Sequence, residues 1–194
     1  MSTPVSADDL ARVLYKPTLY RGVLALVFAA VGIFAVKNPS PVLLSAALGL
    51  LWLLTALFMW PVTRLGGLPS VLRTGWTGAV LAWAVAGILA FFVREPAALA
   101  AMGALGLGLG GVCEAVAGAR TRGIGRPTKD AVISGGVGIL GAVILVAVAA
   151  GMGTRVDVHG VFGTLAMIVA VLGVHLVLAG LGYRHDAARR DDAA

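Results

Sequence analysis

Long apolar segments alternate with short polar segments along the whole chain. The six apolar segments cover residues 20–36, 41–60, 75–93, 97–119, 131–150 and 158–183. Because an α-helix rises about 1.5 Å per residue, roughly 20 apolar residues cross about 30 Å of hydrocarbon. The pattern therefore predicts an all-α, polytopic membrane protein with six transmembrane helices.

The polar segments are of two kinds, and the difference groups the helices into pairs. The segments at 37–41, 94–96 and 151–157 are short, and the first two contain proline, which favours a turn. The segments at 61–73 and 120–129 are longer and basic. We therefore expect three tandem helical hairpins joined by two longer loops.

A polar residue occupies an equivalent place in the second helix of each hairpin. These residues are Thr55, Glu114 and His175. The recurrence favours an internal threefold repeat, in which each hairpin is one repeat unit. Such a repeat would bring the three side chains to a similar depth, where they form a polar core.

Polar segments flank the membrane region at both ends. Residues 1–19 start with a capping-box pattern at Ser6, so they form either a short interfacial helix that ends at Pro17 or a disordered tail. Residues 184–194 are polar and mixed in charge, which is typical of a disordered tail. The membrane domain is expected to span 20–183.

The composition excludes a soluble domain of ordinary type. Of the 194 residues, 59% are hydrophobic and only 12% are charged, whereas soluble domains carry about 25% charged residues. The net charge is +6, but the basic residues lie between the apolar segments, where contact with anionic lipid headgroups is expected rather than nucleic-acid binding. The lipid bilayer is the main partner, and a membrane-protein partner or a homo-oligomer is left open.

The basic residues predict the orientation in the membrane. Twelve of them fall on the side that carries both termini and the two longer loops: Arg12, Lys16, Arg21, Arg64, Arg73, Arg120, Arg122, Arg126, Lys129, Arg184, Arg189 and Arg190. Three fall on the other side: Lys37, Arg94 and Arg155. Since positive residues stay on the cytoplasmic side, both termini are predicted to be cytoplasmic.

Glu114 is the first candidate for a functional side chain. An ionisable residue within a membrane helix is costly and usually faces the protein interior or a water-filled cavity. Such a carboxyl group could exchange protons with its surroundings. The alternative is that Glu114 reaches the cytoplasmic interface and pairs with Arg120 or Arg122.

His175 is the second candidate, because imidazole can gain or lose a proton in the physiological range of pH. It could therefore serve as a proton relay or a pH sensor. The alternative is a neutral histidine that forms a hydrogen bond with a backbone carbonyl or with a neighbouring helix.

Glycines recur every four residues in the fourth apolar segment. Gly106, Gly110 and Gly118 share one helix face with Glu114, and small residues on one face let membrane helices approach closely. The run at 106–111 also has the glycine content of a nucleotide-binding loop, but no strand precedes it and no acidic residue follows at the required distance. Close helix packing is the expected role of these glycines.

The most basic loop contains Arg120, Arg122, Arg126 and Lys129. These residues are candidates for contact with lipid or phosphate. The alternative is that they only set the topology of the membrane helices.

No pattern in the chain is typical of an enzyme. Neither a Ser-His-Asp set, nor paired carboxylates, nor zinc-ligand spacing occurs, and Cys113 is the single cysteine. No catalytic residue, cofactor site or metal site is therefore predicted.

Residues 21–39 read Arg-Gly-Val-Leu-Ala-Leu-Val-Phe-Ala-Ala-Val-Gly-Ile-Phe-Ala-Val-Lys-Asn-Pro. This stretch resembles the opening of the HdeD-like proteins, the DUF308 family, whose repeat starts with Arg-Gly, continues with a glycine-rich helix and an Asn-Pro type turn, and has an acidic residue late in the second helix. Glu114 keeps the acidic residue, whereas Thr55 and His175 depart from it. The resemblance implies a protein of the bacterial inner membrane linked to acid or general stress resistance, with no established enzymatic activity.

Two functional hypotheses follow. The first is a non-enzymatic, HdeD-like protein of the bacterial inner membrane that resists acid or envelope stress or supports a membrane partner complex. The second is a small proton-coupled transporter or channel that uses Glu114 and His175. A water-filled cavity that reaches Glu114 would favour transport, and a dry, glycine-packed core would favour the first hypothesis.

Overall fold

The computed structural model describes residues 6–35 and 39–191, which form six long helices and no strand. The long helices are α1 (Ala7–Ala30), α2 (Pro41–Thr63), α3 (Ser70–Phe92), α4 (Pro96–Arg120), α5 (Arg126–Met152) and α6 (Val158–Asp191). One π-helical turn, η1 (Val31–Ala35), extends α1, and two 3₁₀ turns, η2 (Arg122–Ile124) and η3 (Gly153–Arg155), flank α5. All six helices are long and apolar enough to cross a membrane, which confirms the predicted all-α class and the six spans.

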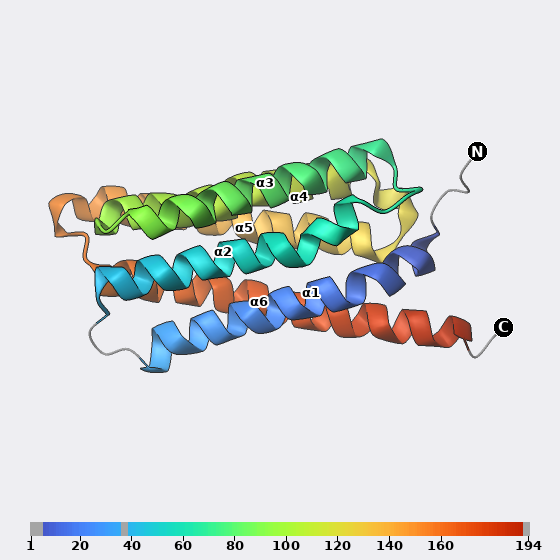
Figure 1. Ribbon diagram of the computed structural model, residues 1–194, viewed down its shortest axis with the longest axis horizontal. Helices are drawn as coiled ribbons and strands as arrows, with labels where there is room; N and C mark the ends of the chain where they lie inside the picture. The colour runs from blue at the N-terminus through green and yellow to red at the C-terminus, as the bar shows by residue number, and fades with distance from the viewer. Residues whose placement is uncertain (1–5, 36–38, 192–194) are drawn as a thin grey trace.

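The six helices form an elongated antiparallel bundle with both termini at one end (Figure 1). The most extensive packing joins α1 to α6 and α4 to α5; α2 with α3 and α3 with α4 pack somewhat less and about equally, and α1 with α2 and α5 with α6 pack less again. The two most extensive interfaces, α1–α6 and α4–α5, therefore join different hairpins, while α3 and α4 of the middle hairpin also pack extensively against each other. Since α6 packs against α1, the chain closes on itself around a common interior.

Glycines permit the close approach of α4 and α5. A β-carbon at Gly111 would lie 2.7 Å from the carbonyl oxygen of Gly135, and one at Gly138 would lie 2.8 Å from the carbonyl oxygen of Leu107. The two backbones therefore approach at a distance that no larger residue allows. In a bilayer such close packing stabilises helix association, because lipid tails are as apolar as the helix surfaces.

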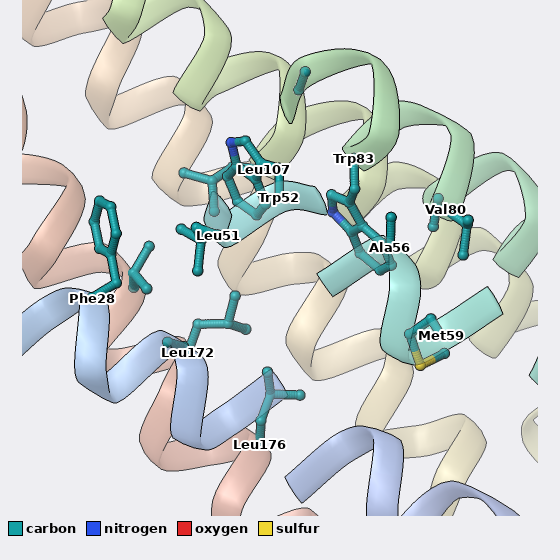
Figure 2. Close-up of a cluster of buried hydrophobic side chains, with 14 of the residues drawn as sticks. Phe28, Leu51, Trp52, Ala56, Met59, Val80, Trp83, Leu107, Leu172 and Leu176 are labelled. Carbon is teal, nitrogen blue, oxygen red and sulfur yellow. The ribbon is translucent and has the colours of Figure 1, made fainter. Parts of the chain in front are cut away.

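Large apolar side chains cover both the interior and the outer surface. Phe28, Leu51, Trp52, Trp83 and Leu107 are buried together between the helices (Figure 2). Many others are exposed on the helix surfaces, among them Val27, Phe92, Leu140, Val171 and Leu178. An apolar outer surface is what lipid tails require of a membrane-spanning bundle.

The prediction for the N-terminal segment was wrong in one respect. Ser6 caps the first helix as expected, with its hydroxyl accepting a hydrogen bond from the backbone N–H of Asp9 at 3.2 Å. The helix does not end at Pro17 but continues through it to Ala30. Leu10 and Leu14 are buried against the bundle, so this segment is the start of a membrane helix rather than a separate interfacial one.

The expected disorder after residue 183 was also wrong, because α6 continues to Asp191. Residues 192–194 lie outside the described part of the chain. So do 36–38, which include Lys37 and most of the turn predicted between the first two helices.

Candidate functional site

A buried ion pair occupies the interior of the bundle. Arg21 Nη1 donates a hydrogen bond to Glu114 Oε1 at 2.8 Å, and the two residues are 5% and 4% exposed. Arg21 lies in the middle of α1, and Glu114 lies in the second half of α4. Because each charge neutralises the other, the pair tolerates an environment in which either charge alone would be very costly.

Two further side chains hold this pair in place. The guanidinium carbon of Arg21 lies 4.4 Å from the centre of the Trp83 ring, which is a cation–π contact. Ser134 Oγ donates a hydrogen bond to Glu114 Oε2 at 3.3 Å. These residues come from α1, α3, α4 and α5, so the polar centre connects all three hairpins.

The indole groups of two tryptophans fill notches beside the ion pair. Trp83 Nε1 donates a hydrogen bond to the carbonyl oxygen of Gly106 at 3.1 Å. A β-carbon at Gly110 would overlap the Trp83 indole, and one at Gly106 would overlap the indole of Trp52. Because these two glycines have no side chain, they leave space for the two indole rings in the interior, where Figure 2 shows both.

Gly118, on the same predicted row, meets a different neighbour. A β-carbon there would overlap the carbonyl oxygen of Thr128 and lie 3.0 Å from the Val132 backbone nitrogen. The row of glycines thus serves two contacts: tryptophan side chains at Gly106 and Gly110, and the backbone of α5 at Gly118.

The partner of Glu114 differs from the expected one. The alternative given for Glu114 was a pair with Arg120 or Arg122 at the membrane interface, but the carboxylate lies in the interior and its ion pair is formed with Arg21. Arg21 had been assigned to the loop charges because α1 was expected to begin at Tyr20. The sequence carries no local signal that places Arg21 inside a longer helix, because Pro17 precedes it and favours a helix end there.

His175 and Thr55 lie near the ion pair without bonding to it. His175 Nε2 lies 3.4 Å from the backbone carbonyl oxygen of Asp130, which is the type of partner that the structural alternative required. Within the described residues, no hydrogen bond or ion pair joins Glu114 to His175. The proposed relay between these two side chains stays a prediction.

Two small cavities flank the ion pair, and both are lined by Arg21, Glu114 and Ser134. Thr55 also lines the first cavity, and His175 also lines the second. Each has a volume of about 20 Å³, which is room for one water molecule. Sites for small organic molecules are typically about 300–1,000 Å³, so these cavities suit water rather than a metabolite.

Three buried polar atoms at these cavities have no hydrogen-bond partner in the described part of the chain. Arg21 Nε and Trp52 Nε1 belong to residues that line the first cavity, and Asp130 Oδ2, which lies 3.7 Å from Arg126 Nε in an ion pair without a hydrogen bond, belongs to a residue that lines the second. Buried polar groups are nearly always paired with protein or with ordered water. The cavities therefore have both the size and the polar groups to bind water.

The four basic residues predicted for one loop lie on different elements: Arg120 ends α4, Arg122 begins η2, and Arg126 and Lys129 lie in the first turn of α5. Arg126 forms ion pairs at 3.7 Å with Asp130 and at 3.7 Å with Asp186. Arg122 and Lys129 are exposed, and Arg120 lines a groove between α3 and α4. Arg126 is thus engaged in holding α5 to α6, while the other three remain available to lipid or phosphate.

No family model, no curated protein and no solved structure matched this chain. Within the described residues, no three His, Cys, Asp or Glu side chains lie together as a metal site would require. What the geometry defines is a six-helix bundle of membrane-spanning type with one neutralised polar centre.

Proposed function

We propose that this chain is a non-enzymatic protein of the bacterial inner membrane, of HdeD-like type, with both termini in the cytoplasm. Its role is to resist acid or envelope stress, or to support a membrane partner complex. The link to stress rests on the resemblance of residues 21–39 to the HdeD-like opening. The orientation rests on the excess of basic residues at the end of the bundle that carries the termini.

The non-enzymatic character is supported by the polar centre, in which Glu114 is already bound by other side chains of the protein. Glu114 is bound by Arg21 at 2.8 Å and by Ser134 at 3.3 Å, so its carboxylate is occupied by groups of the protein itself. The adjoining cavities hold about 20 Å³ each, which is too little for a substrate larger than water. A pair in this position serves to hold the helices in register.

One observation favours the alternative of proton-coupled transport. Glu114 and His175 line the same water-sized cavity, and Asp130 lines it too. A water molecule there could connect a carboxylate and an imidazole, which are the groups that a proton relay needs. The alternative therefore keeps the residues first suggested for it, Glu114 and His175.

A survival experiment tests the proposed function. Cells that lack the chain are exposed to low pH and complemented with wild type, with Glu114→Gln, or with the double variant Arg21→Met/Glu114→Leu. Survival should require the wild-type chain, and the double variant should retain it, since this variant removes both charges together. Equal survival with and without the wild-type chain would contradict the stress role.

Proton flux into vesicles separates the two hypotheses. Purified protein is reconstituted into liposomes that contain a pH-sensitive dye. We expect wild type to give no more flux than protein-free vesicles. Flux by wild type that Glu114→Gln abolishes, while the variant remains folded, would favour the transporter instead.

A further inference from the structure

A groove on the outer surface of α3 and α4 has the size and chemistry of a phospholipid site. Its volume is about 420 Å³, much larger than that of either cavity at the ion pair. This volume lies within the range of roughly 300–1,000 Å³ that is typical of sites for small organic ligands.

Small residues form the floor of this groove. A β-carbon at Gly75 would overlap the side chain of Ala117, and one at Gly78 would lie 3.0 Å from Cys113 Sγ. Since neither Gly75 nor Ala117 projects outward, the surface between the two helices is depressed there. In a bilayer such a depression is filled by hydrocarbon, because water is absent at that depth.

The walls of the groove are apolar and its end is polar. Val71, Val112 and Val116 line the sides and are 39%, 44% and 43% exposed. Arg120, the last residue of α4, lines the groove together with Ser70, the first residue of α3. A cation and a hydroxyl group thus lie where the two helices reach the membrane surface.

Arg120 is available to a ligand. In the part of the chain that the structure describes, no ion pair or hydrogen bond engages its side chain. Arg126, the first residue of α5, is in contrast paired with Asp130 and Asp186. An exposed guanidinium beside an apolar groove complements a lipid that has an anionic headgroup and a hydrocarbon tail.

We propose that the α3–α4 groove is a binding site for an anionic phospholipid, with the phosphate held by Arg120 and an acyl chain lying over Gly75, Cys113 and Ala117. This site is independent of the polar centre and of the function proposed above. In this site Arg120 binds the phosphate, whereas Arg122, which is exposed two residues further on, does not.

Native mass spectrometry of the purified protein measures the headgroup contact. The probes are phosphatidylglycerol and phosphatidylcholine with identical acyl chains. Wild type should retain the first in preference to the second, and Arg120→Gln should lower the retention of phosphatidylglycerol about fivefold. The matched control, Arg122→Gln, should leave it unchanged. Equal losses in the two variants, or no preference in wild type, would overturn the proposal.

The acyl part of the site is tested by filling the groove and by crosslinking. Val112→Trp should displace the lipid, whereas Leu109→Trp, on the same helix and 52% exposed but not lining the groove, should not. Phosphatidylglycerol with a diazirine on its acyl chain should crosslink to residues 71–75 and 112–117 of wild type. Crosslinks only elsewhere would overturn the proposal, and they decide the matter even if Val112→Trp does not fold.

Discussion

Arg21 and Glu114 are 93 residues apart in the chain, and their side chains meet at 2.8 Å in the interior of the bundle. The arginine comes from the first hairpin and the glutamate from the second, and Ser134 of the third hairpin donates to the same carboxylate. One carboxylate therefore connects three structural units. The pair defines how the hairpins are placed relative to one another along the membrane normal.

Removing one partner of this pair should destabilise the bundle strongly. Arg21→Met leaves the Glu114 carboxylate buried and unpaired, so we expect a loss of about 3–5 kcal/mol in the free energy of unfolding. The double variant Arg21→Met/Glu114→Leu removes both charges and should recover most of that loss. Titration with sodium dodecyl sulfate in mixed micelles, followed by circular dichroism, measures both. A double variant as unstable as the single one would show that the pair stabilises the fold by itself.

The notch at Gly110 gives a packing prediction. Gly110→Ala places a methyl group against the Trp83 indole, and we expect a loss of about 1–3 kcal/mol in unfolding free energy. The matched control is Gly136→Ala on α5, because nothing lies within 4 Å of a β-carbon there. Thermal unfolding in detergent compares the two. Equal melting temperatures for both variants would mean that Trp83 moves aside without cost.

Three glycines with free space provide labelling sites for the orientation. In a variant with Cys113→Ser, cysteine is introduced at Gly66, Gly123 or Gly151, and none of these positions has a heavy atom within 4 Å of a β-carbon. The excess of positive charge predicts that Gly66→Cys and Gly123→Cys are protected from an impermeant maleimide in intact cells, while Gly151→Cys is labelled. The reverse pattern would invert the topology.

The role of His175 can be separated from that of Glu114. Because His175 Nε2 lies 3.4 Å from the Asp130 carbonyl oxygen, His175→Gln can keep one hydrogen-bond donor at this place. We expect a change in unfolding free energy below about 1 kcal/mol and unchanged survival at low pH. Loss of survival in a folded His175→Gln variant would instead support a proton relay.

Much of the fold was predictable because a helix that crosses the bilayer must be apolar over about 20 residues, and this pattern is visible in the sequence. Six apolar segments long enough to span the membrane were visible, and the structure has six helices at these places. The ends of the helices were less predictable. Proline usually ends a helix, yet α1 continues through Pro17. Here the burial of Leu10 and Leu14 against the bundle outweighs the hydrogen bond that the proline cannot make.

The candidate site was predictable in part. Glu114 stood out as an intramembrane carboxylate, and its row of glycines indicated that it faced other helices. Its true partner was not recognisable, since Arg21 was equally consistent with a loop position. Trp83, which stacks on Arg21, carries no polar pattern that would mark it as part of the site.

The sequence by itself determined the class of this protein, its six spans and the charge difference between its two ends. Hydropathy and loop charge are local properties, so each segment shows them without reference to the rest of the fold. Only the tertiary structure decided which helices pack closely, which arginine neutralises Glu114, and where a groove remains open to lipid. Those outcomes depend on side chains that are distant in the chain and meet only when α1 packs against α6 and α4 against α5. A buried charge must find a partner, but helix packing decides which partner is within reach.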